Sequence, residues 1–440
     1  MGSRVGGRRY SPACGSLTGP RPGSRYLRGT LNVTASANYI FIADDFTGAT
    51  DTLATLARAG LAVRLFLDVP HPDEVEGLDA FGIASEARAL GNAENAALME
   101  EIARKLAPHR PGIVHLKICS TFDSSPETGN FVRAMEILGR ALGMRSGAIL
   151  GGQPSLGRYC LFGHLFARAA DGTVYRIDRH PIMKAHPVTP MNESDLARHV
   201  AALGGKPPRL VDRVALHHQD DMRLAEDGVT LFDAIDDRDI ARVGAYLQAN
   251  APILCAGASS VAEAVVGDGP RHSPEQVEAD GPVLAFVGSR SSVSADQVRR
   301  ASAYRVIALA PSSLMASCHV EEIAAAPCAA LRRGENVMIC LDASASSGTP
   351  RELAQRSAAL IHTVVRAARV GALAIAGGDT SSAIIRALRP CSIAHCGDID
   401  PGVSLCMANF GSDRPLPIVL KGGQVGRPDL FDHLANEAFR

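Results

Sequence analysis

The chain alternates between continuous apolar runs and stretches that have an apolar residue every three or four positions. Uninterrupted apolar runs are typical of parallel strands covered on both faces, and the second pattern is typical of helices. We predict strands at residues 39–43, 63–67, 112–118, 282–287, 336–341, 372–376 and 417–420. Helices are predicted between them, among others at residues 93–107, 351–368 and 381–388. This alternation predicts an α/β fold with mainly parallel sheets flanked by helices.

The chain has 440 residues, more than one ordinary hydrophobic core accommodates. Residues 266–282 are rich in Gly, Pro and charge and lack an apolar period, so we predict a linker there. It separates two predicted domains, residues 39–265 and 283–440, each with a mainly parallel sheet. Residues 1–38 carry six Arg and no Asp or Glu, which indicates a disordered extension outside the fold. Many turn residues over 151–235 indicate an irregular or antiparallel extension.

Composition limits the partners of the protein. The net charge is −1, which gives no electrostatic reason to bind nucleic acid or an acidic membrane. No apolar run reaches the ~18–20 residues that span a bilayer. The ten cysteines form no CxxC pair, and we interpret most of them as small buried residues of a cytoplasmic protein. We therefore expect small-molecule partners, and the sequence leaves open a homo-oligomer.

Three loops of the C-terminal domain share one character. Each follows a predicted strand and is rich in Gly and small polar residues: Gly288-Ser289-Arg290-Ser291, Gly377-Gly378-Asp379-Thr380 and Lys421-Gly422-Gly423. Small residues let backbone N–H groups approach an anion closely, so the three loops together predict a phosphate site. The chain has neither G-x-x-x-x-G-K-[ST] nor a G-x-G-x-x-G that opens a βαβ unit, which counts against a P-loop protein and a dinucleotide-dependent dehydrogenase.

The loops of the N-terminal domain carry carboxylates, hydroxyls and cations. The candidates are Asp44, Asp45, Arg88, Lys117, Ser120, Thr121 and Asp123. Such a mixture suits a small polyol that bears a carboxylate, because Arg binds the acid as a fork and aspartates accept from hydroxyls. One of the paired aspartates could instead cap the helix that follows. Weaker candidates are Arg158, Arg179, His180 and His186, whereas His164, His217 and His218 are interpreted as non-functional.

Several motifs, taken in order, resemble the four-carbon acid sugar kinases. They are ADDFTGATD (43–51), KICSTFDSS (117–125), HPVTPM (186–191), GGDTSS (377–382), PGV (401–403) and KGGQVG (421–426). The resemblance extends from residue 39 to the end of the chain. It implies an acid-sugar-binding domain followed by a nucleotide-binding domain, and transfer of the γ-phosphate of ATP to an acid such as 3-oxo-tetronate, D-threonate or D-erythronate. The form CSTFDS is similar to the 3-oxo-tetronate kinases, which implies 3-oxo-tetronate 4-phosphate as product.

The resemblance also implies roles for individual residues in a cleft between the domains. It implies that the acid substrate lies near Asp44, Arg88, Lys117, Ser120 and Thr121. For the mechanism we hypothesise that one aspartate, Asp45 or Asp123, orients or deprotonates the terminal hydroxyl of the acid, with Mg²⁺ as cofactor and no protein residue assigned to the metal. The resemblance implies ATP contacts at Ser289, Gly377, Gly378, Asp379, Thr380 and Gly423. The sequence departs from the family at SSPETGNF (124–131) and at KGGQVG.

Two other classes of function are weighed against a kinase. A two-domain α/β oxidoreductase or isomerase would act on a phosphorylated ligand, but the dinucleotide fingerprint is missing. A non-catalytic protein that binds sugar acids between two lobes would be supported by a secretory signal, and none is visible in residues 1–38.

Overall fold

The computed structural model describes residues 38–169, 171–186, 188–218, 228–267, 277–316, 320–342, 348–411 and 413–439. The expected extension lies outside these ranges except for Asn38, and the expected linker is described only at residues 266–267 and 277–282. The side chains of Asp379 and Asp413 also lie outside the described part. Within these ranges, every helix is too short or too polar to cross a lipid bilayer.

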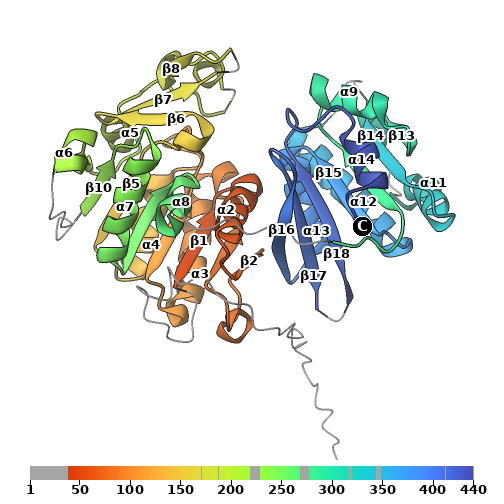
Figure 1. Cartoon of the computed structure of the whole chain (residues 1–440), viewed down its shortest axis with the longest axis horizontal. Helices are drawn as coiled ribbons and strands as arrows, with labels where there is room; N and C mark the ends of the chain where they lie inside the picture. The colour runs from red at the N-terminus through yellow and green to blue at the C-terminus, as the bar shows by residue number, and fades with distance from the viewer. Residues whose placement is uncertain are drawn as a thin grey trace, which may run out of the picture.

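The N-terminal half of the chain forms a parallel sheet with helices on both faces (Figure 1). Across the sheet its strands lie in the order β2 (Val63–Phe66), β3 (Ala80–Ala84), β1 (Tyr39–Ala43), β4 (Ile113–Lys117), β11 (Ile253–Gly257), β5 (Ser146–Leu150), β10 (Gly228–Phe232) and β9 (Arg209–Val211). One face is covered by α2 (Phe46–Arg58), α6 (Arg213–His218), α7 (Asp237–Ala249) and α8 (Ser260–Val266). The other face is covered by α3 (Asn92–Leu106), α4 (Phe131–Ala141) and α5 (Leu196–Ala202).

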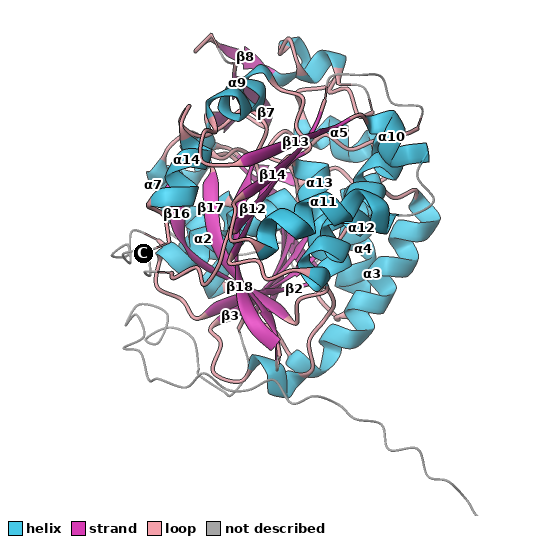
Figure 2. Ribbon diagram, turned by 90° about the vertical axis from the view of Figure 1, so that its right-hand side faces the viewer, coloured by secondary structure: helices cyan, strands magenta, loops and turns pink. Residues whose placement is uncertain are grey.

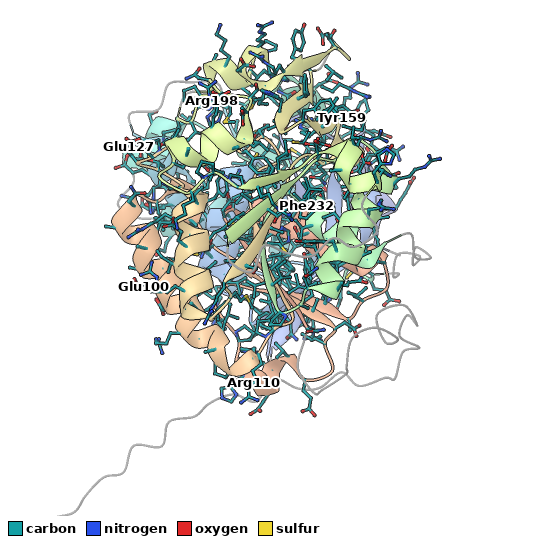
Figure 3. The ribbon with its side chains drawn as sticks, turned by 90° about the vertical axis from the view of Figure 1, so that its left-hand side faces the viewer. Glu100, Arg110, Glu127, Tyr159, Arg198 and Phe232 are labelled. Atoms are coloured by element: carbon teal, nitrogen blue, oxygen red, sulfur yellow. The ribbon has the colours of Figure 1, made fainter. Side chains whose placement is uncertain are left out.

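A small antiparallel sheet extends this half between β5 and α5. Its strands are β6 (Arg158–Leu161), β7 (His164–Arg168) and β8 (Val174–Arg176). Figure 3 shows Phe232 of β10 in the interior, and Tyr159 of β6 and Arg198 of α5 at the end of the half that carries the small sheet. Short 3₁₀ turns complete the half: η1 (Pro72–Val75), η2 (Ala87–Ala89), η3 (Ala107–His109), η4 (Pro154–Leu156), η5 (Ile177–Arg179) and η6 (Met183–Ala185).

The C-terminal half has the same layered architecture (Figure 2). Its parallel strands lie in the order β13 (Arg305–Leu309), β14 (Val337–Leu341), β12 (Val283–Val287), β15 (Ala372–Ala376) and β18 (Asp413–Lys421). The antiparallel strands β17 (Val403–Phe410) and β16 (Ser392–Asp400) follow. One face is covered by α9 (Ser292–Arg300) and α14 (Leu430–Asn436). The other is covered by α10 (Pro311–Ala316), α11 (Val320–Arg332), α12 (Pro350–Ala367) and α13 (Gly378–Leu388).

The two halves share one sheet, which the sequence did not predict. Ile393 of β16 pairs with Leu65 of β2 in antiparallel orientation, so that fifteen described strands form a continuous sheet. Arg58 of α2 also binds Asp398 at 2.7 Å between side-chain atoms Nε and Oδ2. The pairing satisfies backbone groups that both edge strands would otherwise expose. An apolar run predicts a strand, but it does not predict which edge pairs with which.

Local sequence explains where the helices begin. Thr349 and Glu352 form a capping box at α12, and Pro350 occupies the first helical position. Helix α13 begins at Gly378, earlier than the predicted residue 381. Its N-cap, Gly377, has φ of +127°, a conformation that side chains rarely adopt, so the strand turns into the helix within one residue. The Gly-rich pair therefore belongs to the helix start and brings its free N–H groups to the strand end.

Candidate active site

Asp44 and Asp45 directly follow β1 and have different local roles. Asp45 is the N-cap of α2, and its Oδ1 accepts a hydrogen bond of 2.6 Å from the backbone N of Gly48. Asp44 is buried, with 9% of its surface exposed, and its backbone N donates to the carbonyl oxygen of Lys117. The structure therefore gives Asp45 the capping role that the sequence left open for one of the pair, and Asp44 has no such role.

Arg88, in a short turn after β3, compensates both carboxylates. Its Nη2 and Nε donate to the two oxygens of Asp44 at 2.8 and 3.1 Å. Its Nη1 lies 2.5 Å from Oδ2 of Asp45. Burial raises the pKa of Asp44 to about 6, and the charge of Arg88 acts against that rise. The guanidinium fork is thus engaged with aspartate in this structure, while its predicted contact with a substrate carboxylate stays a prediction.

Lys117 lies beside this pair because β4 is the neighbour of β1. Its buried side chain donates from Nζ to the carbonyl oxygen of Ile118 at 2.8 Å. A Cβ atom on Gly48 would lie 2.6 Å from Nζ of Lys117 and 2.7 Å from Oδ1 of Asp45. Only glycine therefore allows the lysine, the aspartate and the start of α2 to approach one another so closely.

The loop after β4 holds Asp123 in a network of hydroxyls. The hydroxyl of Thr121 donates to Oδ1 of Asp123, and the hydroxyl of Thr189 donates to Oδ2 at 3.2 Å. Thr189 also lies 3.1 Å from Nδ1 of His186. Asp123 is 7% exposed, so both of its oxygens are buried against partners of this chain. Ser120 of the same loop is partly exposed.

The Gly-rich loops of the C-terminal half follow the adjacent strands β12, β15 and β18, where the connecting helices change from one face of the sheet to the other. β12 and β15 are neighbours, but α9 follows β12 on one face of the sheet and α13 follows β15 on the other. From the carboxyl ends of these two adjacent parallel strands, the chain therefore continues toward opposite faces of the sheet. Such a switch point is where open α/β sheets bind ligands. The N-terminus of α13 and its unpaired N–H groups point to the same place, which favours an anion.

Close packing joins the three loops. A Cβ atom on Gly288 would lie 2.5 Å from the hydroxyl oxygen of Thr380, and one on Gly423 would lie 2.6 Å from that of Ser289. The hydroxyl of Ser291 donates to the carbonyl oxygen of Gly423. The structure thus brings together the backbone of every residue that the sequence predicted to contact ATP, although the side chain of Asp379 lies outside the described part. Their contact with ATP stays a prediction.

The loops of the two halves touch each other. A Cβ atom on Gly378 would lie 3.3 Å from the hydroxyl oxygen of Thr47, two residues after Asp45. Further along α13, Arg386 donates from Nη2 to the carbonyl oxygen of Ala84 at 3.0 Å, and its Nε lies 2.9 Å from Oε1 of Glu86. The aspartate pair and the Gly-rich helix start therefore lie on the same side of the shared sheet, next to each other.

The weaker candidates have structural partners. Nδ1 of His180 accepts from the backbone N of Ile182 and Met183, and Arg158 donates to the carbonyl oxygen of Leu156. Nothing in the described structure joins Arg179 to the aspartates. Sequence reasoning missed three residues that the structure brings to the site, and the ADDFTGATD and HPVTPM motifs each held a signal for one of them. They are Thr47, Thr189 and Arg386.

The donor set fits a magnesium ion that arrives with a nucleotide. Mg²⁺ in phosphotransferases takes most of its oxygen ligands from phosphates and water, and one or two from protein. Among the described residues, no group of three or more His, Cys, Asp or Glu side chains could form a metal cage. Thr380 has a hydroxyl oxygen at the switch point, and a Ser or Thr hydroxyl is a ligand that Mg²⁺ takes in other nucleotide sites.

Comparisons with known proteins agree with this arrangement. A sugar-binding N-terminal domain matches residues 39–265, and a nucleotide-binding C-terminal domain matches residues 284–431. A 3-oxo-isoapionate kinase of Paraburkholderia graminis is 30% identical over 435 residues, covering 89% of this chain and 92% of its own length. A 3-oxo-tetronate kinase of Cupriavidus necator is 28% identical, covering 89% and 95%. A D-threonate kinase of Bordetella bronchiseptica is 26% identical, with the same coverage.

Solved structures show the same fold. A Salmonella typhimurium LT2 protein matches with a TM-score of 0.76 at 22% identity, covering 92% of this chain and 99% of that one. A Haemophilus influenzae protein of the DUF1537 family matches with a TM-score of 0.70 at 21% identity, covering 90% and 98%. Both alignments span the two halves, so the layered architecture with two parallel portions is common to all three proteins.

Proposed function

The chain belongs to the four-carbon acid sugar kinase family, which joins a sugar-binding N-terminal domain to a nucleotide-binding C-terminal domain, and we propose that it phosphorylates a sugar acid with ATP. The observation that carries the proposal is the contact between the two sets of loops. Thr47, beside the aspartate pair, approaches Gly378 at the start of α13. A sugar acid held by the loops of the N-terminal half would thus face a triphosphate held by the Gly-rich loops of the C-terminal half.

The proposed reaction is a direct in-line transfer. The oxygen of the acceptor hydroxyl bonds to the γ-phosphorus, the bond from that phosphorus to the bridging oxygen breaks, and ADP leaves. The proton of the hydroxyl passes to Asp45. We assign this role to Asp45 rather than Asp123, because 29% of the side chain of Asp45 is exposed while both oxygens of Asp123 accept internal hydroxyls. A general base of this kind must lie within about 2.6–3.2 Å of the hydroxyl.

The C-terminal loops would hold the phosphates through backbone N–H groups at the start of α13 and through Ser289. Positioning and electrostatic stabilisation supply most of the catalysis in phosphoryl transfer. Mg²⁺, when bound with ATP, neutralises the transferring group, and Thr380 would hold it together with the phosphate oxygens. The contact of Arg386 of α13 with Ala84 and Glu86 supports this arrangement, because it would hold the proposed donor and acceptor loops close together.

For the substrate we propose 3-oxo-tetronate first. The CSTFDS loop supports it, as do several relatives that are 3-oxo-tetronate kinases. A second candidate is 3-oxo-isoapionate, which the relative at 30% identity phosphorylates according to its name. Both are 3-oxo acids, whereas D-threonate and D-erythronate are not. The departure at residues 124–131 follows the loop that we propose to bind the acid, and it is where a different acid would be accommodated.

An assay of ATP consumption across a panel of acids tests this proposal. The purified protein with Mg²⁺ and ATP is given 3-oxo-tetronate, 3-oxo-isoapionate, D-threonate or D-erythronate, and a reaction without acceptor is the control. We expect ADP to form fastest with a 3-oxo acid, with a matching phosphomonoester signal by ³¹P NMR. Background rates of ADP formation with all four acids would contradict the proposal. A faster reaction with D-threonate would keep the kinase activity but contradict the assignment of a 3-oxo acid.

A further inference from the structure

Lys421 is a buried cation at the end of β18, and the nucleotide site proposed above gives its charge no role. Its residue surface is 4% exposed, and its Nζ donates to the hydroxyl of Ser294 at 3.1 Å. Ser294 in turn donates to the carbonyl oxygen of Gly423 at 3.0 Å. Within the described residues, no carboxylate lies at ion-pair distance from Nζ. An ammonium has three N–H groups, so two of them are available for another acceptor.

The surroundings of Lys421 lack negative charge on every described side. Ser294 lies in the first turn of α9, which is the electropositive end of that helix and therefore an unfavourable place for a cation. Its neighbours across the sheet are Ala376 of β15 and Val403 of β17. Burial lowers the pKa of Lys421 to about 8. A buried ammonium without a counter-ion is costly, so this site is built for an anion that binds there.

The position of Lys421 indicates which anion. Its carbonyl oxygen accepts from the backbone N of Gly377, the residue that opens α13, and it precedes the Gly422-Gly423 turn. Through Ser294, Nζ is therefore hydrogen-bonded to the Gly-rich turn that packs with the other two loops at the switch point. A lysine that only clamped the turn would need its hydrogen bond to Ser294, but it would not need a charge.

We propose that Lys421 binds the phosphate chain of the nucleotide through its ammonium group. The proposal rests on the nucleotide site proposed above and adds to it a buried charged side chain. Lys421 acts as a point charge on phosphate oxygens, and the polar loops position it. Because an approaching phosphate favours the charged form of the amine, binding above pH 8 takes up a proton.

The first test compares affinities for ATP and adenosine by calorimetry. Lys421→Met is expected to weaken ATP binding roughly 30-fold or more, as loss of one partner of a desolvated charge pair does. Its affinity for adenosine, which has no phosphate, is expected to stay within about twofold. The matched control Ser294→Ala keeps the ammonium and removes its hydrogen bond, so ATP affinity is expected to fall less than about fivefold. Equal losses in the two variants would overturn the proposal in favour of a structural clamp.

The second test needs no variant, so it holds even where Lys421→Met fails to fold. ATP binding to the unaltered protein is measured near pH 8.5 in buffers of different ionisation enthalpy. We expect net uptake of a proton that is absent at pH 6.5. Binding of ATP without proton uptake at pH 8.5 would overturn the role of Lys421 and leave the nucleotide site intact. Failure of the unaltered protein to bind ATP would overturn both proposals.

Discussion

Asp45→Asn is expected to lower kcat by about 10²–10⁴-fold, the usual contribution of a positioned general base. Asparagine is as good an N-cap as aspartate, so the hydrogen bond from the backbone N of Gly48 and the start of α2 are kept. What disappears is the carboxylate that takes the proton and pairs with Arg88. The ATP site that we propose lies in loops of the other half, so the Kd of ATP is expected to change less than about twofold. Steady-state kinetics and calorimetry measure the two quantities.

The matched control for this prediction is Asp123→Asn. Asp123 accepts hydroxyl hydrogen bonds at both oxygens, so this variant is expected to disturb the loop and raise KM more than it lowers kcat. If Asp45→Asn turned over at a near-normal rate while Asp123→Asn lost activity, the two roles would be reversed. Both variants need a thermal unfolding curve close to that of the unaltered protein.

Arg88→Met is expected to lower the free energy of unfolding by about 3–5 kcal/mol at pH 8. The side chain of Arg88 is 29% exposed and its guanidinium contacts two aspartates, of which Asp44 is the more buried. Methionine fills similar volume but removes the guanidinium that contacts both adjacent carboxylates, and Lys117 is then the cation that stays beside them. Denaturant unfolding of both proteins measures the difference. The same variant is expected to lose most kinase activity, because Asp45 loses the partner that positions it.

The stability loss expected for Arg88→Met depends on pH, and the pKa of Asp44 determines in which direction. Burial raises the folded pKa of Asp44 to about 6, above its ordinary value of 3.8. The stability that protonation of Asp44 contributes is therefore fully present below pH 3.8 and is lost as the pH rises through 6. Removing Arg88 raises that folded pKa further, because the guanidinium lowers it. The stability difference between the two proteins is therefore expected to be larger at pH 8 than at pH 5, where Asp44 of both is mostly protonated.

A double variant isolates the cause of the loss. Adding Asp44→Asn to Arg88→Met removes one of the two carboxylates, and we expect it to recover about 1–3 kcal/mol at pH 8. Recovery at pH 8 that vanishes at pH 5 would identify charge as the cause. Equal losses at both pH values, with no recovery in the double variant, would instead indicate that Arg88 acts through packing alone.

The sequence predicted the strands well because each is a continuous apolar run. All seven predicted strands are present, and β1 has the predicted bounds of 39–43. The carboxyl ends of those strands also located the candidate loops, since parallel strands end at one edge. The predicted domain limits, with residues 39–265 binding the acid and 283–440 the nucleotide, stay predictions.

Pairings between distant residues could not be predicted in the same way. Arg88 is 44 positions from Asp44, and the sequence offered it to the substrate instead. Thr189 reaches Asp123 across 66 positions through an irregular segment that has no periodic pattern. The contact of Thr47 with Gly378 depends on how the β16 edge meets β2, which no local preference determines. The residue types of the site could be predicted, but their partners could not.

We expect one site to span both halves at the contact of Thr47 and Gly378. A crystal structure with a non-hydrolysable ATP analogue, Mg²⁺ and 3-oxo-tetronate tests it most directly. We expect the γ-phosphate between the start of α13 and the start of α2, with the acceptor hydroxyl within about 3 Å of Asp45. Nucleotide and acid bound on separate surfaces, with Asp45 facing neither, would contradict it.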